Sequence, residues 1–141
     1  MNDEVRNMCQ EILNMDENER LDIGRESLSR MVNGLKGLGL NGEETTNLIL
    51  NLTKLFVSAD ARCSEEEYQF FVKVTGINIS RDEFFEMTNY GKDADFVNGL
   101  VELMRNADPD TRTATVLFGV ALMSHNGQLS SDELRLIDSL L

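Results

Sequence analysis

The chain has 141 residues, of which 41% are hydrophobic and 27% charged, so it is long enough to bury a core and is not disordered by composition. The 25 acidic residues outnumber the 13 Lys and Arg, and the formal net charge is -12. Because phosphate binding needs clustered basic side chains, this charge argues against nucleic acid and anionic membranes as direct partners. It is compatible with cations or with a basic protein partner.

The predicted elements are helices along the whole chain, since there is one proline and no sustained alternation of apolar and polar residues. Apolar residues cover nearly every face of 114–123, which is typical of a helix in the middle of a bundle. The expected fold class is all-α, a single bundle of about seven or eight helices with two related helical hairpins. In chain order, helices are expected over about 3–13, from after 15 to 35, from 43, over 64–76, from 80, over 93–105, from 109 and from 130 to the last residue.

A glycine-rich segment, residues 33–44, interrupts the helical pattern and predicts a linker. It separates N-terminal helices at 1–36 from a helical domain at 37–141, and we expect the first to pack on the second. The segment contains a GxGxxG pattern, but a nucleotide-binding loop of this kind follows a strand, and here a helix precedes it. We therefore interpret the glycines as a helix end and a turn, and expect no nucleotide cofactor.

The cysteines and the apolar segments indicate the compartment. Cys9 and Cys63 follow no disulfide pattern and fit a reducing environment. The first residues lack the basic and apolar regions of a signal peptide, and the most apolar run, 114–123, is too short to span a bilayer. We expect a cytoplasmic protein.

The chain repeats one pattern at an offset of 66 residues: SADARCSEEEYQFF at 58–71 and SHNGQLSSDELRLI at 124–137. Apolar positions before and after both turns align as well, so the repeated unit is a helix, a short turn and a second helix. We expect the two hairpins to pair around one core, with the turns close together on one side. Both turns contain an S-x-x-E capping box, in which the serine oxygen accepts a backbone N–H and the glutamate bonds the serine N–H.

The same polar residues have an alternative interpretation as oxygen ligands of a divalent cation. The second turn resembles the second half of an EF-hand loop, with Asn126 and Glu133 at ligand positions. The first position of that loop requires an oxygen donor, but Leu122 falls on it, and Phe56 does so in the first copy. A standard EF-hand is therefore not expected, which leaves a single site formed by the paired turns.

A long apolar helix, a D-G-x-x-S-x-x-E-type turn and a second helix, used twice, resemble the TerB-like domain family, which is named for tellurite-resistance proteins. SADARCSEEE and SHNGQLSSDE carry the resemblance, which covers about residues 43–141. It implies an all-α bundle in the bacterial cytoplasm or at the inner face of the membrane. It also implies a stress-associated interaction role, with a protein partner and in some members an association with membrane-protein complexes.

The resemblance further implies an acidic metal-binding patch between the two turns. This chain departs from the family pattern, because Ala61 replaces the first glycine and Asn126 replaces the second aspartate. The second change removes a carboxylate that a hard cation would prefer. Carried onto this sequence, the candidate ligands for calcium or magnesium are Asp60, Glu66, Glu67, Asn126, Asp132 and Glu133.

Three functions from different classes remain open. The first is a TerB-like binding or scaffold module, and the second is a divalent-cation-binding domain. An enzyme is not expected, because the lone His125 and the capping serines form no set of nucleophile, base and orienting group. If the second predicted helix packs loosely, Met31, Val32 and Leu35 would offer a surface to a partner.

Overall fold

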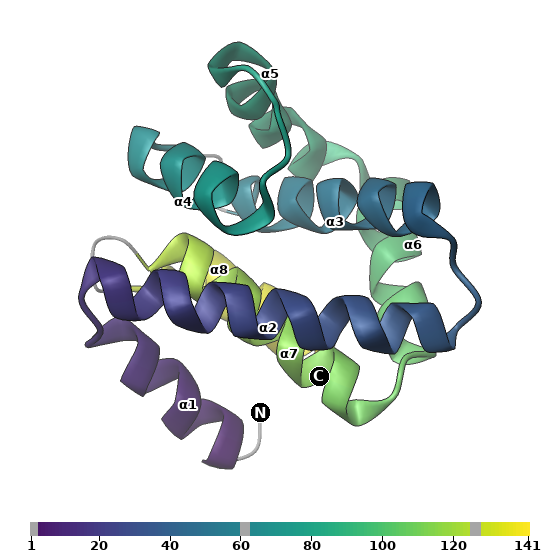
Figure 1. The fold of residues 1–141 in the computed structure, drawn as a ribbon, viewed down its shortest axis with the longest axis horizontal. Helices are drawn as coiled ribbons and strands as arrows, with labels where there is room; N and C mark the ends of the chain where they lie inside the picture. Colours follow the sequence, from purple (N-terminus) through teal and green to yellow (C-terminus); the bar gives the residue numbers. More distant parts are fainter. Residues whose placement is uncertain (1–2, 60–62, 125–127) are drawn as a thin grey trace.

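A computed structural model describes residues 3–59, 63–124 and 128–141 of the chain. Over these ranges the chain forms eight α-helices and one 3₁₀ helix and no strand, which confirms the expected all-α bundle (Figure 1). The elements are α1 (Asp3–Leu13), α2 (Glu17–Gly37), α3 (Gly42–Val57), α4 (Glu65–Thr75), α5 (Arg81–Glu86), η1 (Met87–Lys92), α6 (Ala94–Arg105), α7 (Pro109–Met123) and α8 (Ser131–Leu140).

Each helix from α2 to α8 begins at a capping side chain. The Asp16 carboxylate accepts the Glu19 N–H at 2.8 Å, and the Asn41 side chain accepts the Glu44 N–H at 2.8 Å. In both cases the glutamate also accepts the N–H of the cap residue, which completes a capping box. Because these bonds satisfy amides that have no partner within the helix, the local sequence determines where each helix starts. The other caps are Ser64, Ser80, Asp93, Asp108 and Ser130.

The glycine-rich segment is a helix end and a turn, as predicted. α2 extends to Gly37, and Gly39 adopts a φ of 87°, in the left-handed region that favours glycine. The connection to α3 is only residues 38–41, shorter than the linker expected from the glycines. The division into 1–36 and 37–141 stays a prediction, and α2, the larger part of the first segment, packs along α7.

The pairing of α2 with α7 is the most extensive helix contact, and it lies near the middle of the bundle (Figure 1). α7 is buried on nearly all sides, as its sequence predicts. Small residues allow the close approach of the two helices: a Cβ on Gly34 of α2 would overlap the side chain of Thr111 on α7. On the same helix, a Cβ on Gly24 would come within 2.6 Å of the Phe70 ring of α4.

The expectation that Met31 and Leu35 form an exposed partner surface is wrong. Both side chains are 0% exposed, and Val32 is partly buried. Because Met31 and Leu35 are four residues apart, they share one face of α2, and that face packs into the core. α2 is therefore an internal helix rather than a loosely attached one.

The two repeated hairpins, α3–α4 and α7–α8, meet through α7. This helix contacts both α3 and α4 as well as its own partner α8. The rings of Phe70 on α4 and Phe118 on α7 have centroids 6.4 Å apart. Gly119 allows the Phe56 ring of α3 to lie directly on α7, since a Cβ at this glycine would overlap the ring. The two hairpins share a core. Within it, α7 makes its most extensive contact with α2.

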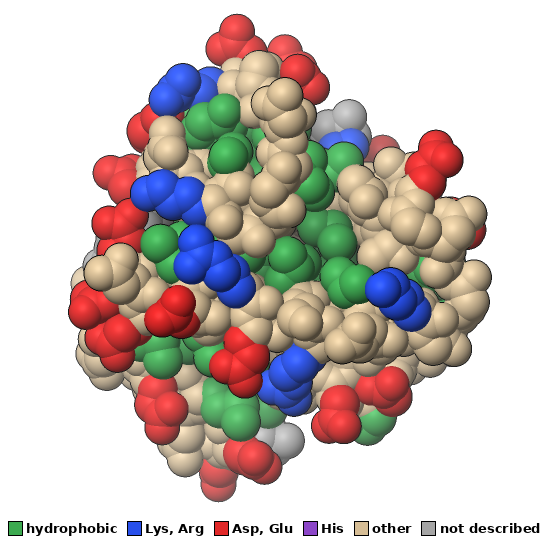
Figure 2. Space-filling model, viewed as in Figure 1, with side chains coloured by type: hydrophobic (Ala, Val, Ile, Leu, Met, Phe, Trp, Pro, Cys, Tyr) green, Lys and Arg blue, Asp and Glu red, His purple; other side chains and the backbone are tan. Residues whose placement is uncertain are grey.

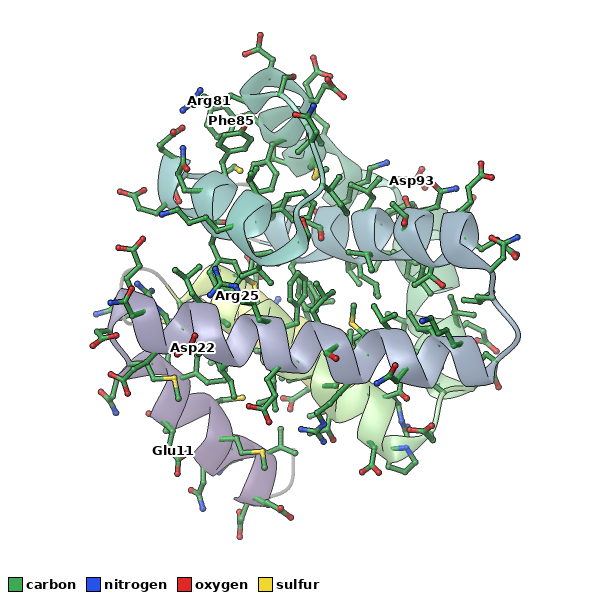
Figure 3. All side chains as sticks on the ribbon, in the orientation of Figure 1. Glu11, Asp22, Arg25, Arg81, Phe85 and Asp93 are labelled. Carbon is green, nitrogen blue, oxygen red and sulfur yellow. The ribbon has the colours of Figure 1, made fainter. Side chains whose placement is uncertain are left out.

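Aromatic side chains pack α5 against α4. Phe84 is 0% exposed, and its ring centroid lies 5.6 Å from that of Tyr68 and 5.5 Å from that of Phe71. Phe85, the next residue, is 37% exposed, and it lies beside Arg81 at the outer edge of the bundle (Figure 3). The two neighbouring phenylalanines therefore face the core and the solvent respectively.

The surface reflects the acidic composition. In Figure 2, acidic side chains surround the periphery, and hydrophobic side chains gather along the seam between α2 and the layer formed by α3 and α4. In the parts of the chain that the structure describes, no helix combines the length and the apolar character needed to cross a bilayer.

Candidate functional site

The sequence places the candidate site at two corners of the bundle. We call residues 58–64, between α3 and α4, the first corner and residues 124–130, between α7 and α8, the second corner. Two of the six predicted ligands, Asp60 and Asn126, lie outside the described residues, as does His125. The structure places the other four at the starts of the helices that follow, with Glu66 and Glu67 on α4 and Asp132 and Glu133 on α8.

The second corner contains the predicted capping box. Ser130 Oγ accepts the Glu133 N–H at 3.1 Å, and Glu133 Oε1 accepts the Ser130 N–H at 2.8 Å. Glu133 is only 7% exposed. A carboxylate in such a position needs hydrogen-bond donors to offset the loss of water, and the backbone N–H of Ser130 supplies one. Glu133 therefore has a structural use that needs no ion.

The first corner repeats this arrangement with one difference. Ser64 Oγ accepts the Glu67 N–H at 3.1 Å and donates its hydroxyl hydrogen to Glu67 Oε1 at 3.3 Å. The Glu67 carboxylate therefore bonds the Ser64 hydroxyl, whereas the predicted capping box would have it accept the Ser64 N–H. Glu67 is 6% exposed. Both copies thus bury a glutamate at the same position of the helix, so the repeat in sequence is also a repeat in structure.

Replacing either capping serine is expected to destabilise the protein. We expect Ser130→Ala and Ser64→Ala each to lower the free energy of unfolding by about 1 kcal/mol, because a backbone N–H loses its acceptor. Urea denaturation followed by circular dichroism measures the change, which we expect to be the same with and without added calcium.

Ser131 offers a matched control for this experiment, because it is exposed and follows the cap. Ser131→Ala is expected to change the free energy of unfolding by less than about 0.5 kcal/mol. An effect of Ser131→Ala as large as that of Ser130→Ala would show that the cap has been assigned to the wrong residue.

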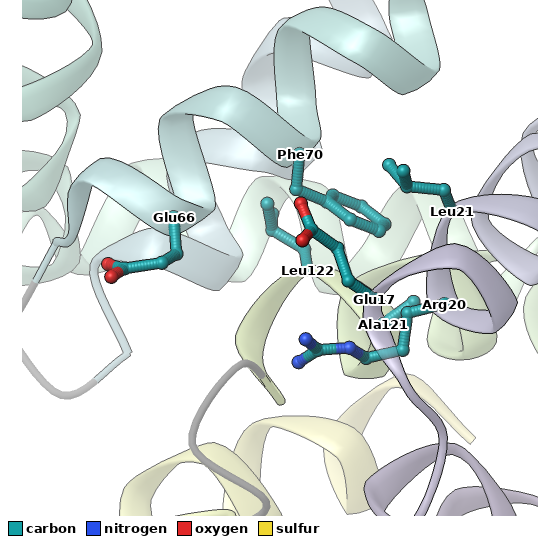
Figure 4. Close-up of a pocket in the computed structure, with 7 residues that line it drawn as sticks. All are labelled: Glu17, Arg20, Leu21, Glu66, Phe70, Ala121 and Leu122. Carbon is teal, nitrogen blue, oxygen red and sulfur yellow. The ribbon is translucent and has the colours of Figure 1, made fainter.

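Glu66, the second predicted ligand on α4, is exposed. It lines a small cavity of about 110 Å³ between α4, α2 and α7. Figure 4 shows the Glu66 carboxylate directed away from the Phe70 ring, while Glu17 and Arg20 reach the same cavity from α2. The Nε atom of Arg20 is buried and has no hydrogen-bond partner among the described groups. Because the guanidinium carries a positive charge, it opposes a cation in this cavity.

Asp132, a predicted ligand on α8, lies in a different environment. Its Oδ1 atom is 3.3 Å from Arg135 Nη1, one turn further along α8. Asp132 lines a cavity of about 270 Å³ that is also lined by Ser58 of the first corner and Val97 of α6. Glu66 and Asp132 occupy equivalent positions in the repeat, but they line different cavities.

Glu65, the first residue of α4, is held by a cation from the next helix. Both carboxylate oxygens of Glu65 lie 2.9 Å from Arg81 Nε, and Arg81 Nη2 is 2.8 Å from Oε1. The Arg81 guanidinium lowers the pKa of the Glu65 carboxyl, with help from the Gln69 amide, and the carboxylate in turn raises the pKa of Arg81. The Arg81 guanidinium also stacks over the Tyr68 ring, 5.1 Å from its centroid. Glu65 is thus committed to an ion pair between helices.

These placements bear on the metal hypothesis. Over the described ranges, there is no group of three or more His, Cys, Asp or Glu side chains placed to hold a metal ion. Glu66, Glu67, Asp132 and Glu133 therefore do not form such a group by themselves. A shared site would depend on Asp60 and Asn126, so the six-residue ligand set stays a prediction.

Sequence reasoning missed a groove between the first and last helices. Its volume is about 540 Å³, and residues of α1, of α8 and of the segment just before α8 line it. Leu134, which lines the groove, is 41% exposed, and Leu141 is 36% exposed. Leu141 follows the end of α8 and does not line the groove, so the spacing of the two leucines gives no sequence signal for it.

No protein-family model matches the chain, and searches of curated proteins and of solved structures find no match either. The resemblance to the TerB-like family therefore rests on the corner sequences and stays a prediction.

Proposed function

We propose that this chain is a non-enzymatic, TerB-like helical module that acts by binding another protein. The observation that carries the proposal is the groove between α1 and α8, whose lining includes the exposed Leu134 of α8 together with Leu13 and Leu129. Exposed apolar side chains that gather beside a concave surface, rather than singly, are typical of binding sites. The -12 charge of the chain favours a partner that carries basic residues.

The reactive groups near the groove and the corners support a binding role over catalysis. Cys9 lines the groove but is 5% exposed, and burial raises the pKa of its thiol. The thiol is therefore protonated at neutral pH and is a poor nucleophile. Ser64 and Ser130 are used as helix caps, since each Oγ accepts a backbone N–H, from Glu67 and Glu133 respectively.

The setting of this role follows from the resemblance. A TerB-like module would act in a bacterial stress response of the tellurite-resistance type, in the cytoplasm, with a protein partner and in association with a membrane-protein complex. These features belong to the proposal, and a partner identified by experiment would test them together.

Affinity capture from a bacterial lysate, with the purified chain as bait, tests the proposed function. Each captured protein is then purified, and its binding is measured by calorimetry at about 0.15 M salt. We expect at least one to bind directly with a Kd in the micromolar range or below, and to bind more weakly as salt is raised. Failure of every captured protein to bind again in pure form would contradict the proposal.

The burial of Glu67 and Glu133 at equivalent positions favours a second candidate function, cation binding at the corners. Both carboxylates already accept hydrogen bonds, and a divalent cation is a further partner that the two corners could share. Carboxylate oxygens are also the ligands that calcium and magnesium prefer.

A shared cation site predicts that millimolar calcium or magnesium raises the melting temperature, because the ion binds only the native state. Asp60→Asn combined with Glu67→Gln is expected to abolish the rise, as measured by differential scanning calorimetry. Asp95→Asn, which removes an exposed carboxylate from α6, is the control and is expected to retain it. No shift in the unmodified chain would leave the corner glutamates with their capping role alone.

A further inference from the structure

The groove between α1 and α8 has one wall formed by a single face of α1. Arg6, Cys9, Gln10 and Leu13 line it, and their spacing of three, four and seven residues places them along one stripe of the helix. This stripe covers two turns, or about 10 Å of helix axis. α1 and α8 run in opposite directions in Figure 1, so the groove follows two antiparallel helices.

The opposite wall combines apolar and polar side chains. Leu129 and Leu134 line the groove from the α8 side, together with Gln128 and Asp138. The buried face of α8 is a different one, formed by Leu136, Ile137 and Leu140. The 41% exposed Leu134 is therefore not needed to pack α8 on the bundle.

The shape of this surface fits a helix better than an extended peptide. A groove between two antiparallel helices accepts the apolar stripe of a third, whose anchors recur at intervals of three, four and seven residues. No unpaired strand edge exists over the described residues, so addition of a peptide strand is not available here.

Charge decides which helix fits. The groove itself is lined by one arginine, Arg6, and one acidic residue, Asp138, but α1 and α8 together carry six acidic residues and two arginines, so the two helices have a net negative charge. A second copy of this chain has a formal net charge of -12 and would bring the same sign to the contact. Lys and Arg residues on both sides of an apolar stripe would instead complement the walls.

We propose that the groove between α1 and α8 is the docking site for an amphipathic helix of a partner protein, with leucine-type anchors flanked by Lys and Arg. This inference rests on the proposed function, since it gives the binding module its site and the chemistry of its partner. The anchors lie between Leu134 and the α1 stripe, and the basic flanks lie near Asp138 and the other acidic residues of the two helices.

The test uses the full chain and a synthetic amphipathic peptide of about 15 residues, with leucines at helical spacing and lysines on both flanks. Binding is measured by fluorescence anisotropy, and circular dichroism confirms that each variant is folded. We expect saturable binding that Leu134→Glu weakens at least about tenfold. Leu103→Glu is the matched control, because Leu103 is 36% exposed on α6 and does not line the groove. It is expected to change the Kd by less than about twofold.

A second pair of variants tests the α1 wall. Gln10→Arg adds a positive charge at the groove and is expected to weaken binding of the basic peptide at least about threefold. Asn7→Arg adds the same charge to the same helix at an exposed position that does not line the groove, and it is expected to weaken binding less.

Three results would overturn the inference. The first is no saturable binding of the basic peptide below about 1 mM. The second is equal weakening by Leu134→Glu and Leu103→Glu. The third is a homodimer in analytical ultracentrifugation that Leu134→Glu dissociates, which would make a second copy the occupant. A protein that is captured from lysate and rebinds in pure form, with the same Kd for the Leu134→Glu variant, would leave the proposed function intact. It would exclude only this site.

Discussion

Gly119→Ala is expected to lower the free energy of unfolding by about 3 kcal/mol, although alanine is normally the better helix former. Gly119 lies in the interior of α7, where a Cβ would overlap the ring of Phe56 from α3. Phe56 is 1% exposed, so its ring is enclosed and cannot move aside without disturbing other core side chains. Urea denaturation at equilibrium, compared with the unmodified chain, measures the effect.

Gly99 provides the matched control. It lies in α6, and a Cβ added there would meet no atom within 4 Å. Gly99→Ala is therefore expected to stabilise the protein by about 0.5–1 kcal/mol through helix propensity alone. A double variant with Phe56→Leu is expected to recover part of the loss at Gly119, since it shortens the side chain that is overlapped. If Gly119→Ala stabilised the protein as Gly99→Ala does, the packing of α3 on α7 described here would be wrong.

Phe84→Ala is expected to lower the free energy of unfolding by about 3–5 kcal/mol. The Phe84 side chain is 0% exposed and lies among the rings of Tyr68, Phe71 and Phe85. Its removal loses the burial of a whole ring and leaves a cavity between α4 and α5 that rigid neighbours cannot fill. Thermal and urea unfolding both report the change.

Phe85→Ala is the comparison that makes this result informative. Phe85 is the next residue and the same amino acid, but it is 37% exposed and contacts only the edge of the cluster, 6.3 Å from the Phe84 centroid. We expect a loss of about 1 kcal/mol or less. Equal losses for the two variants would mean that α5 is rotated about its axis relative to the described orientation.

The helices could be predicted from sequence because their signals are local. Helices were predicted to begin after 15, from 80 and from 109, and in the structure Asp16, Ser80 and Asp108 cap the helices that begin at these positions. The all-round apolar character of 114–123 predicted burial, and α7 is buried. Each of these inferences needs only residues within a turn or two of one another.

The packing partner of α7 could not be predicted in the same way. The repeat indicated that the two hairpins would meet. In the structure, α7 contacts α2, which belongs to no repeat, more extensively than it contacts α3, α4 or α8. The contact of Gly34 with Thr111 joins residues far apart in the chain, and no local pattern reports such a pair. For the same reason, the sequence left open whether Met31 and Leu35 would be exposed, and the structure places both in the core.

In the candidate site, too, local features could be predicted and contacts between distant segments could not. The caps at Ser64 and Ser130 were predicted, since a cap is a contact over three residues. The ligand set stays a prediction, because it requires the relative placement of two corners and includes Asp60 and Asn126, which lie outside the described residues. The groove was missed, because it exists only once α1 and α8 lie beside each other.

The partnership of α2 with α7 has a consequence for biosynthesis. The ribosome completes α2 at Gly37, but the helix that covers its apolar face ends only at Met123. During translation, the part of α2 that packs on α7 therefore stays uncovered until α7 has been synthesised. Folding must then close a long loop before that contact forms, so we expect a late, cooperative collapse rather than stepwise growth from the N-terminus.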